Sequence, residues 1–467
     1  MPTQQLLFIY THLKIIDMYE LIIAIFVIGY IGIAFEHPIH INKAASAIIT
    51  GVLCWTVYIL FPTSFVDPSQ FPSSFMESIK ESQLSLSEND LITHFVGHQL
   101  LHFLSEVSSI LFFLLGAMTI VELVDAHKGF SVITDRIKTT NKVKLLWIVS
   151  IVTFFLSSVL DNLTTAIVMV SLLRKLVSSK EDRMFFCGIV IIAANAGGAW
   201  SPIGDVTTTM LWIGGQITAL TIVKTLFIPS LVCIVVPMLF LSFTMKGLIE
   251  RSANTVIPGT HQANVSESEK KIVFILGIGG LLFVPVFKTF THLPPFMGML
   301  LSLGILWIVT ELMHKGKTEQ DKDAATVGGV IRKVDTPSVL FFLGILIAIG
   351  ALQSTGILVN AANSMDKLIG NQNVIVITIG LLSSIVDNVP LVAAGMGMYS
   401  FPTDHSFWHF LAYCAGTGGS ALIIGSAAGV AVMGMEKIDF IWYFKKMSLL
   451  ALLGYFTGAF TFVLMNL

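Results

Sequence analysis

The stretch that decides the fold is SSVLDNLTT, Ser157 to Thr165, and a second version of it, SSIVDNVPL, runs from Ser383 to Leu391. Each version places one aspartate inside a long apolar segment. A carboxylate in hydrocarbon is costly, and it is kept mainly where it faces a cavity, an ion or a proton path. Asp161 and Asp387 are therefore the first candidates for a functional site.

The apolar segment around the first aspartate has two short arms. Each arm of residues 145–173 is shorter than the roughly 17 to 25 residues that a tilted transmembrane helix needs. Lys142 and Lys144 precede the segment, and Arg174 and Lys175 follow it. Because Lys and Arg collect on the cytoplasmic side, both ends are expected to be inside. The pattern predicts a re-entrant hairpin that enters from the cytoplasm and turns near the Asp-Asn pair.

The composition is that of a polytopic membrane protein, not a soluble enzyme. The chain has 467 residues, 54% of them hydrophobic and 12% charged, and its mean hydropathy is +0.83. A net charge of −2 gives nucleic acid no reason to bind. The four cysteines are scattered singly, which suggests neither a disulfide framework nor a zinc site. The start lacks the pattern of a cleaved signal or transit peptide, so the first span is expected to remain in the mature protein.

Two Gly-rich runs interrupt later apolar segments. NAGGAWSPIGD, Asn195 to Asp205, lies inside residues 184–215, and GTGGSALIIGSAAG, Gly416 to Gly429, lies inside residues 407–433. Gly and Pro at this density disfavour a continuous helix, and irregular backbone at membrane depth is tolerated only where it is buried in protein or lines a cavity. We therefore predict two discontinuous transmembrane helices.

The order of hairpin, Gly-rich break and span occurs twice. The second hairpin, residues 373–401, has few basic residues at its ends and is expected to enter from outside. This predicts two inverted repeats, residues 1–251 and 271–467, joined by a cytoplasmic linker at 252–270, with both termini outside. Further helices are expected near Leu21–Phe35, Ala44–Phe61, His98–Val124, Leu220–Met245, Ile272–Phe287, Pro294–Met313, Ser338–Leu352, Ile357–Ile369 (amphipathic) and Met447–Leu464.

The polar residues of the four motifs offer almost only oxygen ligands, which suit a small hard cation. No Lys or Arg lies inside these motifs to receive an anion, and no nucleotide-binding Walker A sequence occurs, so an ion gradient would drive transport. Burial favours the protonated carboxyl group and a bound cation favours the ionised one, so proton and cation would compete. We expect Asp161 and Asp205 to be the principal carriers. The residues that would complete the site are Asn162, Thr164, Thr165, Asn195, Thr207, Thr208, Asp387, Asn388, Ser420 and Ser426.

Four segments, SSVLDNLTTAIV, NAGGAWSPIGDVTTTMLW, SSIVDNVPLVAA and LLGAMTIVELVDAHKGF, resemble the NhaD-type sodium/proton antiporters of the ion transporter superfamily. The resemblance runs from about Phe26 to the C-terminus. It implies a homodimeric antiporter in a bacterial inner membrane that exchanges Na⁺ or Li⁺ for H⁺ and holds no cofactor. Ser426 stands where the first repeat has Asp205, which is the poorest match. The site residues it implies are Asp161, Asn162, Asn195, Asp205, Thr207, Thr208, Ser384 and Asn388, with Glu106 and His98 as weaker candidates.

Other readings remain open. Asp161, Asp205 and Asp387 could serve only as N-caps of the helices that follow them. Glu106 could pair with a neighbouring histidine, while His98 could act as a pH sensor or as an interfacial anchor. A sodium-coupled symporter of dicarboxylates or oxyanions would share the architecture, but it would favour small neutral residues at the aspartates. An intramembrane aspartyl protease would use two paired carboxyl groups, but it has no need of an inverted duplication.

Overall fold

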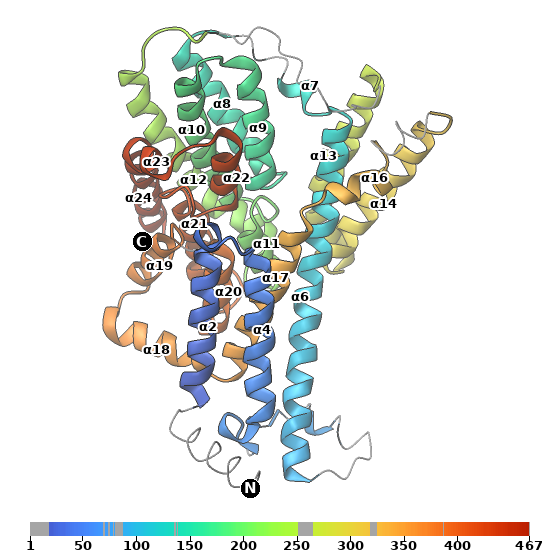
Figure 1. Ribbon diagram of the computed structural model, residues 1–467, viewed down its shortest axis with the longest axis vertical. Coiled ribbons are helices and arrows are strands. Elements are labelled where there is room, and N and C mark those ends of the chain that lie inside the picture. The colour runs from blue at the N-terminus through green and yellow to red at the C-terminus, as the bar shows by residue number, and fades with distance from the viewer. Residues whose placement is uncertain are drawn as a thin grey trace. The chain divides into compact units, whose positions relative to one another are not determined.

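The computed structural model describes residues 18–68, 71–72, 75–77, 79, 87–134, 137, 139–250, 265–317, 325–385 and 387–466. Within these ranges the chain is almost wholly helical (Figure 1), and eight helices are long and apolar enough to cross a membrane. The chain is a multi-pass membrane protein. It divides into two compact units, the first from Met1–Ser108, Thr336–Leu368 and Ala393–Ser400, and the second from Ser109–Asp335, Ile369–Val392 and Phe401–Leu467.

The first unit is built around α4 (Lys43–Leu60), which packs against α2 (Met18–Ala34) and α17 (Thr336–Ser354). Gly51 of α4 faces α17, where a Cβ at this position would lie 2.7 Å from the Gly344 carbonyl oxygen. Small residues at such a crossing let two membrane helices approach closely. The helices expected at these three places are confirmed, and α4 and α17 are long and apolar enough to cross a membrane, whereas α2 is one residue shorter than α4 and is not among the eight. The unit also contains α3 (Glu36–Ile39), η1 (Pro62–Ser64) and the amphipathic α18 (Ile357–Ile369), whose bounds are those predicted.

Helix α6 (Glu88–Ala126) is longer than expected. It has 39 residues, whereas the sequence predicted a span over His98–Val124. At a rise of 1.5 Å per residue it is about 58 Å long, nearly twice the roughly 30 Å of a bilayer core. The polar residues at its start therefore extend the helix beyond the apolar span.

The second unit holds most of the remaining helices. The packed pairs α12 with α24, α8 with α10 and α19 with α21 build its core, whereas α13 and α14 pack mainly on each other and leave most of their surface unburied. The elements are α7 (Ser131–Thr134), α8 (Lys142–Ser157), α9 (Asn162–Leu176), α10 (Lys180–Ala199), α11 (Val206–Ile213), α12 (Ala219–Thr244), α13 (Glu267–Thr291), α14 (Pro295–Met313), α16 (Val327–Val330), η3 (Ile331–Lys333), α19 (Gln372–Leu382), α20 (Asn388–Met398, which ends in the first unit), α21 (Ser406–Gly418), α22 (Ala427–Glu436), α23 (Phe440–Lys446) and α24 (Ser448–Met465).

Each predicted hairpin coincides with two short helices joined by a turn, and the re-entrant insertion of both pairs stays a prediction. Helices α8 and α9 have 16 and 15 residues, and the chain turns between them at residues 158–161. Helices α19 and α20 have 11 residues each. All four are shorter than the roughly 30 Å core of a bilayer, because even 16 residues extend only about 24 Å. The side from which each hairpin enters stays a prediction.

The predicted breaks begin too early in the sequence. Asn195 to Ala199 continue α10, and Gly416 to Gly418 continue α21, so the chain leaves the helix only at Trp200 and at Gly419. The glycines that suggested a break instead permit close packing. A Cβ at Gly197 would collide with the Phe154 carbonyl oxygen of α8, and one at Gly418 with the Gly380 carbonyl oxygen of α19.

The linker predicted at 252–270 is also shorter than expected. A capping box formed by Ser266 and Glu269 starts α13, so the last residues of the predicted linker are helical. Residues 251–264, which make up most of that prediction, lie outside the described residues.

Candidate functional site

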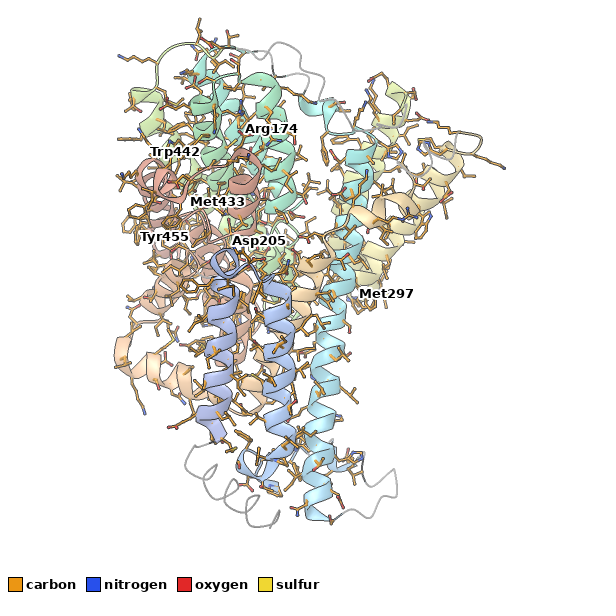
Figure 2. The ribbon with its side chains drawn as sticks, in the orientation of Figure 1. Arg174, Asp205, Met297, Met433, Trp442 and Tyr455 are labelled. Atoms are coloured by element: carbon orange, nitrogen blue, oxygen red, sulfur yellow. The ribbon has the colours of Figure 1, made fainter. Side chains whose placement is uncertain are left out.

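Asp205 lies at the centre of a buried polar cluster, and its side chain is labelled in Figure 2. Only 1% of the residue is exposed. It is the N-cap of α11, and its Oδ1 accepts hydrogen bonds from the backbone N–H and the hydroxyl of Thr207, each at 2.9 Å. The Thr208 hydroxyl donates to the Asp205 carbonyl oxygen at 2.9 Å. The cap fixes where the carboxylate points.

Two asparagines, one from each hairpin, approach the same carboxylate. Asn162, the first residue of α9, donates from Nδ2 to Asp205 Oδ2 at 2.8 Å and to Asn195 Oδ1 at 3.0 Å. Asn388, the first residue of α20, places its Nδ2 3.4 Å from both Asp205 oxygens. The asparagines of the two Asp-Asn pairs, Asn162 and Asn388, therefore both contact the Asp205 carboxylate.

Asn195 extends the cluster to the second broken helix. It lies on α10, and its Nδ2 donates to Ser420 Oγ at 2.9 Å and to Ser426 Oγ at 3.0 Å. Both serines lie in the stretch between α21 and α22, and each is 2% exposed. We call the resulting cluster the asparagine–aspartate network. It connects the starts of α9 and α20 with the two breaks, and it consists of Asn162, Asn195, Asp205, Thr207, Asn388, Ser420 and Ser426.

The chemistry of the network follows from its single carboxylate. Its members offer carboxylate, amide and hydroxyl oxygens, and none of them is a Lys or Arg that would neutralise Asp205. A buried charge without a counter-ion is costly. A small monovalent cation or a proton at Asp205 removes that cost, and the two would exclude each other.

Asp161 is held differently. Its Oδ1 accepts the Thr164 N–H at 2.6 Å and its Oδ2 accepts the Thr164 hydroxyl at 2.9 Å, so both oxygens cap α9. Its backbone has φ 124° and ψ 161°, a region that is essentially reserved for glycine. Such strain costs on the order of 1–3 kcal/mol and clusters at functional sites. Nearby on α9, the buried Thr165 hydroxyl has no partner among the described residues.

The other predicted residues lie at the edge of the network or away from it. Asp387 accepts the Val389 N–H at 3.4 Å at the start of α20. The Ser384 hydroxyl donates to the Leu381 carbonyl of its own segment at 2.7 Å and takes no part in the network. His98 and Glu106 lie on the part of α6 in the first unit, where Glu106 is 3.7 Å from His102 and both side chains are mostly exposed.

Sequence reasoning missed an ion cluster formed by the C-terminal ends of α9 and α22 and the first turn of α10. Glu436, at the end of α22, accepts from Arg174 Nε at 2.6 Å and from Arg183 Nε at 2.8 Å. Arg174 also donates to the Met435 carbonyl. The Glu436 side chain is 2% exposed. In the sequence Arg174 indicates only membrane topology, and no local pattern pairs either arginine with a glutamate in the other half of the chain.

A buried, oxygen-rich site among short and interrupted membrane helices defines a class: a polytopic membrane transport protein. The model of the citrate transporter family matches residues 23–404. Sodium/proton antiporter 1 of Arabidopsis thaliana is 49% identical over 93% of this chain and 70% of its own length, and sodium/proton antiporter 2 of the same plant is 45% identical over 94% and 98%. The Na⁺/H⁺ antiporter NhaD of Vibrio cholerae is 32% identical over 78% and 80%. This chain therefore belongs to the citrate transporter family and, within it, to the NhaD-type sodium/proton antiporters.

Proposed function

We propose that this protein is a secondary transporter that exchanges Na⁺ or Li⁺ for H⁺, with Asp205 and Asp161 as the carriers. The observation that carries the proposal is the buried carboxylate of Asp205, which is contacted by Asn162 at the start of α9 and by Asn388 at the start of α20. The names of the relatives support the same activity. These residues can bind and release a cation and a proton, which is sufficient for transport and requires no covalent chemistry.

In the proposed cycle, ionised Asp205 binds the cation together with amide and hydroxyl oxygens of the network. A proton arriving from the opposite side neutralises the carboxylate and removes the charge that held the cation. Thr207 keeps the carboxylate in place in both states, because its N–H and hydroxyl both donate to Oδ1. Asp161 would carry the second charge at the neighbouring helix start.

Access from both sides would come from the two inverted repeats, residues 1–251 and 271–467. Matching contacts support this proposal. The Ser157 hydroxyl donates to the Ala194 carbonyl at 2.6 Å, and the Ser383 hydroxyl donates to the Ala415 carbonyl at 2.8 Å, each joining a hairpin to its broken helix. Within the second unit, α8 and α9 lie toward the top of Figure 1 and α19 lies lower, as hairpins that enter from opposite sides would.

We further propose a homodimer in a bacterial inner membrane, with both termini outside. The basic ends of the first hairpin support its cytoplasmic side. Light scattering of the purified protein measures the oligomeric state, and cysteine labelling from each side of the membrane measures the orientation of the hairpin ends. A monomer, or labelling of both hairpins from one side, would contradict this part.

The test of the proposed activity is dye-monitored ΔpH in inverted vesicles after addition of Na⁺, Li⁺ or K⁺. The native chain should dissipate ΔpH with Na⁺ or Li⁺, and Asp161→Asn and Asp205→Asn should lose most of this response because neither amide can carry a proton or balance a cation. Asp366→Asn removes an exposed carboxylate from α18 and is the matched control. If both site variants respond like the native chain, the assignment of the carriers is wrong.

Sodium-coupled symport of a carboxylate anion, a dicarboxylate or the tricarboxylate citrate, is the second candidate. The description of the matching family supports it. Helices α9, α11, α20 and α22 all begin at residues of the network or directly beside them, and helix N-termini attract anions. The Asp205 carboxylate opposes such a substrate. Sodium-dependent uptake of labelled citrate, with no change in ΔpH beyond that of empty vesicles, would favour this reading over antiport.

A further inference from the structure

A cavity of about 240 Å³ lies away from the asparagine–aspartate network, among the ends of four elements of the second unit. Lys142 begins α8, Phe185 lies in the first turns of α10, Lys246 follows α12, and Trp442 and Lys446 belong to α23. Figure 2 labels Trp442 on α23. The cavity is therefore lined by three lysines and by aromatic side chains.

The charges of the lining leave two lysines available. Lys142 Nζ is 2.6 Å from Asp182 Oδ1, so its charge is balanced within the wall. Lys246 and Lys446 are exposed and form no ion pair with any residue in the described part of the chain. Glu181 is the remaining acidic residue of the lining. Two unpaired ammonium groups beside one carboxylate favour an anionic ligand.

The surroundings favour a ligand with apolar chains. Phe243 is 82% exposed at the end of α12, and Leu248 is 69% exposed just after it. On α23, Ile441 and Phe444 are 51% and 55% exposed. Trp collects at the level of lipid headgroups, and apolar side chains exposed beside a basic cluster are typical of a membrane interface.

We propose that this cavity binds the phosphate-bearing headgroup of an anionic membrane lipid, with Lys246 and Lys446 at the phosphate and the acyl chains lying along Phe243 and Phe444. Basic pockets between membrane helices on the cytoplasmic side bind anionic headgroups. A lipid bound there would contact the starts of α8 and α10 as well as α23 at the membrane interface. Helix α8 leads to the Asp161 turn, and α10 leads to Asn195. The site is independent of the cation exchange proposed above.

The test measures lipid binding to the purified full-length chain, with no transport readout. Detergent-solubilised protein is titrated with dioleoylphosphatidylglycerol, dioleoylphosphatidylcholine or inorganic phosphate, and bound lipid is counted by native mass spectrometry. The phosphatidylglycerol should bind at least about tenfold more tightly than the phosphatidylcholine. The double variant Lys246→Gln, Lys446→Gln should lose about tenfold of that affinity.

The matched control is the double variant Lys445→Gln, Lys315→Gln. It removes the same charge from α23 and from another basic loop, but neither lysine lines the cavity. It should bind phosphatidylglycerol within about twofold of the native chain, and gel filtration of both variants checks that they fold. Equal binding of the two lipids, an unchanged Lys246/Lys446 variant, an equal loss in the control, or displacement of the lipid by millimolar inorganic phosphate would overturn the proposal. The last result would assign the cavity to a free anion.

Discussion

The two broken helices, α10–α11 and α21–α22, share a scaffold but differ in chemistry. In each, a glycine packs against a backbone carbonyl of the neighbouring short helix, Gly197 on Phe154 and Gly418 on Gly380. In each, a backbone carbonyl also accepts a hydrogen bond from a serine hydroxyl at the end of that short helix. Asp205 begins α11, whereas Ser426 begins α22. Asn195 bridges to the other half, whereas the corresponding position of α21 is Gly416. The two breaks share a scaffold, and of the two only the first supplies a carboxylate and a bridging amide to the network.

This difference bears on how much charge the network can carry. If both breaks supplied an aspartate, two carboxylates would share one buried space, and one of them would have to stay protonated or bind a further cation. With Ser426 in the second break, Asp205 is the only carboxylate that the two breaks supply to the network. Any second carrier has to come from a hairpin, and Asp161 is the candidate.

The largest expected effect is a loss of stability when the close glycine contact that both breaks share is blocked. Gly197→Ala and Gly418→Ala each place a methyl group against a carbonyl oxygen of the facing hairpin, and backbone cannot swing aside as a side chain can. Each variant should lose about 3 kcal/mol of stability or fail to fold. The thermal midpoint in detergent, measured by fluorescence-detected gel filtration, checks this.

Gly434→Ala is the matched control for the glycine variants. It lies on α22, and a Cβ there meets no atom within 4 Å. Its midpoint should equal that of the native chain. A large difference between Gly197→Ala and Gly418→Ala would show that the two breaks do not share one scaffold.

The next largest effect is a loss of transport activity when the residues that differ between the two breaks, Asp205 and Ser426, are exchanged. Exchanging their polar residues in the double variant Asp205→Ser, Ser426→Asp keeps the composition but moves the carboxylate away from Thr207, Asn162 and Asn388. We expect an activity loss of about 100-fold, equivalent to about 2.7 kcal/mol, in the ΔpH assay. Retention of more than half of the native activity would mean that the two positions are interchangeable.

A smaller effect is expected for the bridging amide. Asn195→Ala removes two hydrogen bonds to serines and leaves Asn162 with one acceptor, so the apparent affinity for Na⁺ should fall about tenfold, or about 1.4 kcal/mol. Gly416→Ala is the counterpart in the other helix. A Cβ there would lie 3.4 Å from the Ala199 Cβ and 3.8 Å from Asp205 Oδ2, which is ordinary contact, so its affinity should stay within about twofold. Equal losses in both variants would contradict the asymmetry.

The sequence predicted the fold well where a physical constraint is local. Apolar length predicted the long helices, and a carboxylate in apolar sequence marked the turns between the short helices. Asn162, Asn195 and Asp205 could be chosen because a polar group in a membrane segment is costly unless it has a function. The helix ends near Asn195 were predicted wrongly, because glycine was taken as a helix breaker when its role is close packing. Asn388 was chosen by the same local signal as Asn162, and Ser426 was chosen only through the repeat.

Long-range pairing could not be predicted. The contact of Glu436 with Arg174 and Arg183 joins the two halves of the chain, and neither partner is unusual in its local sequence. Likewise, the sequence could not show that both carboxylate oxygens of Asp161 accept hydrogen bonds from Thr164, whereas only one oxygen of Asp205 accepts from Thr207. Which aspartate faces the other half is decided by packing.

The central claim is that a cation and a proton compete for Asp205. Its most direct test is proton release on cation binding, measured with a pH dye as NaCl is added to the purified native chain and to Asp205→Asn in weakly buffered detergent solution, with choline chloride as the control salt. The native chain should release protons with Na⁺ and not with choline, and the release should fall sharply in Asp205→Asn. Native Na⁺ binding without proton release, or an undiminished release from Asp205→Asn, would contradict the account.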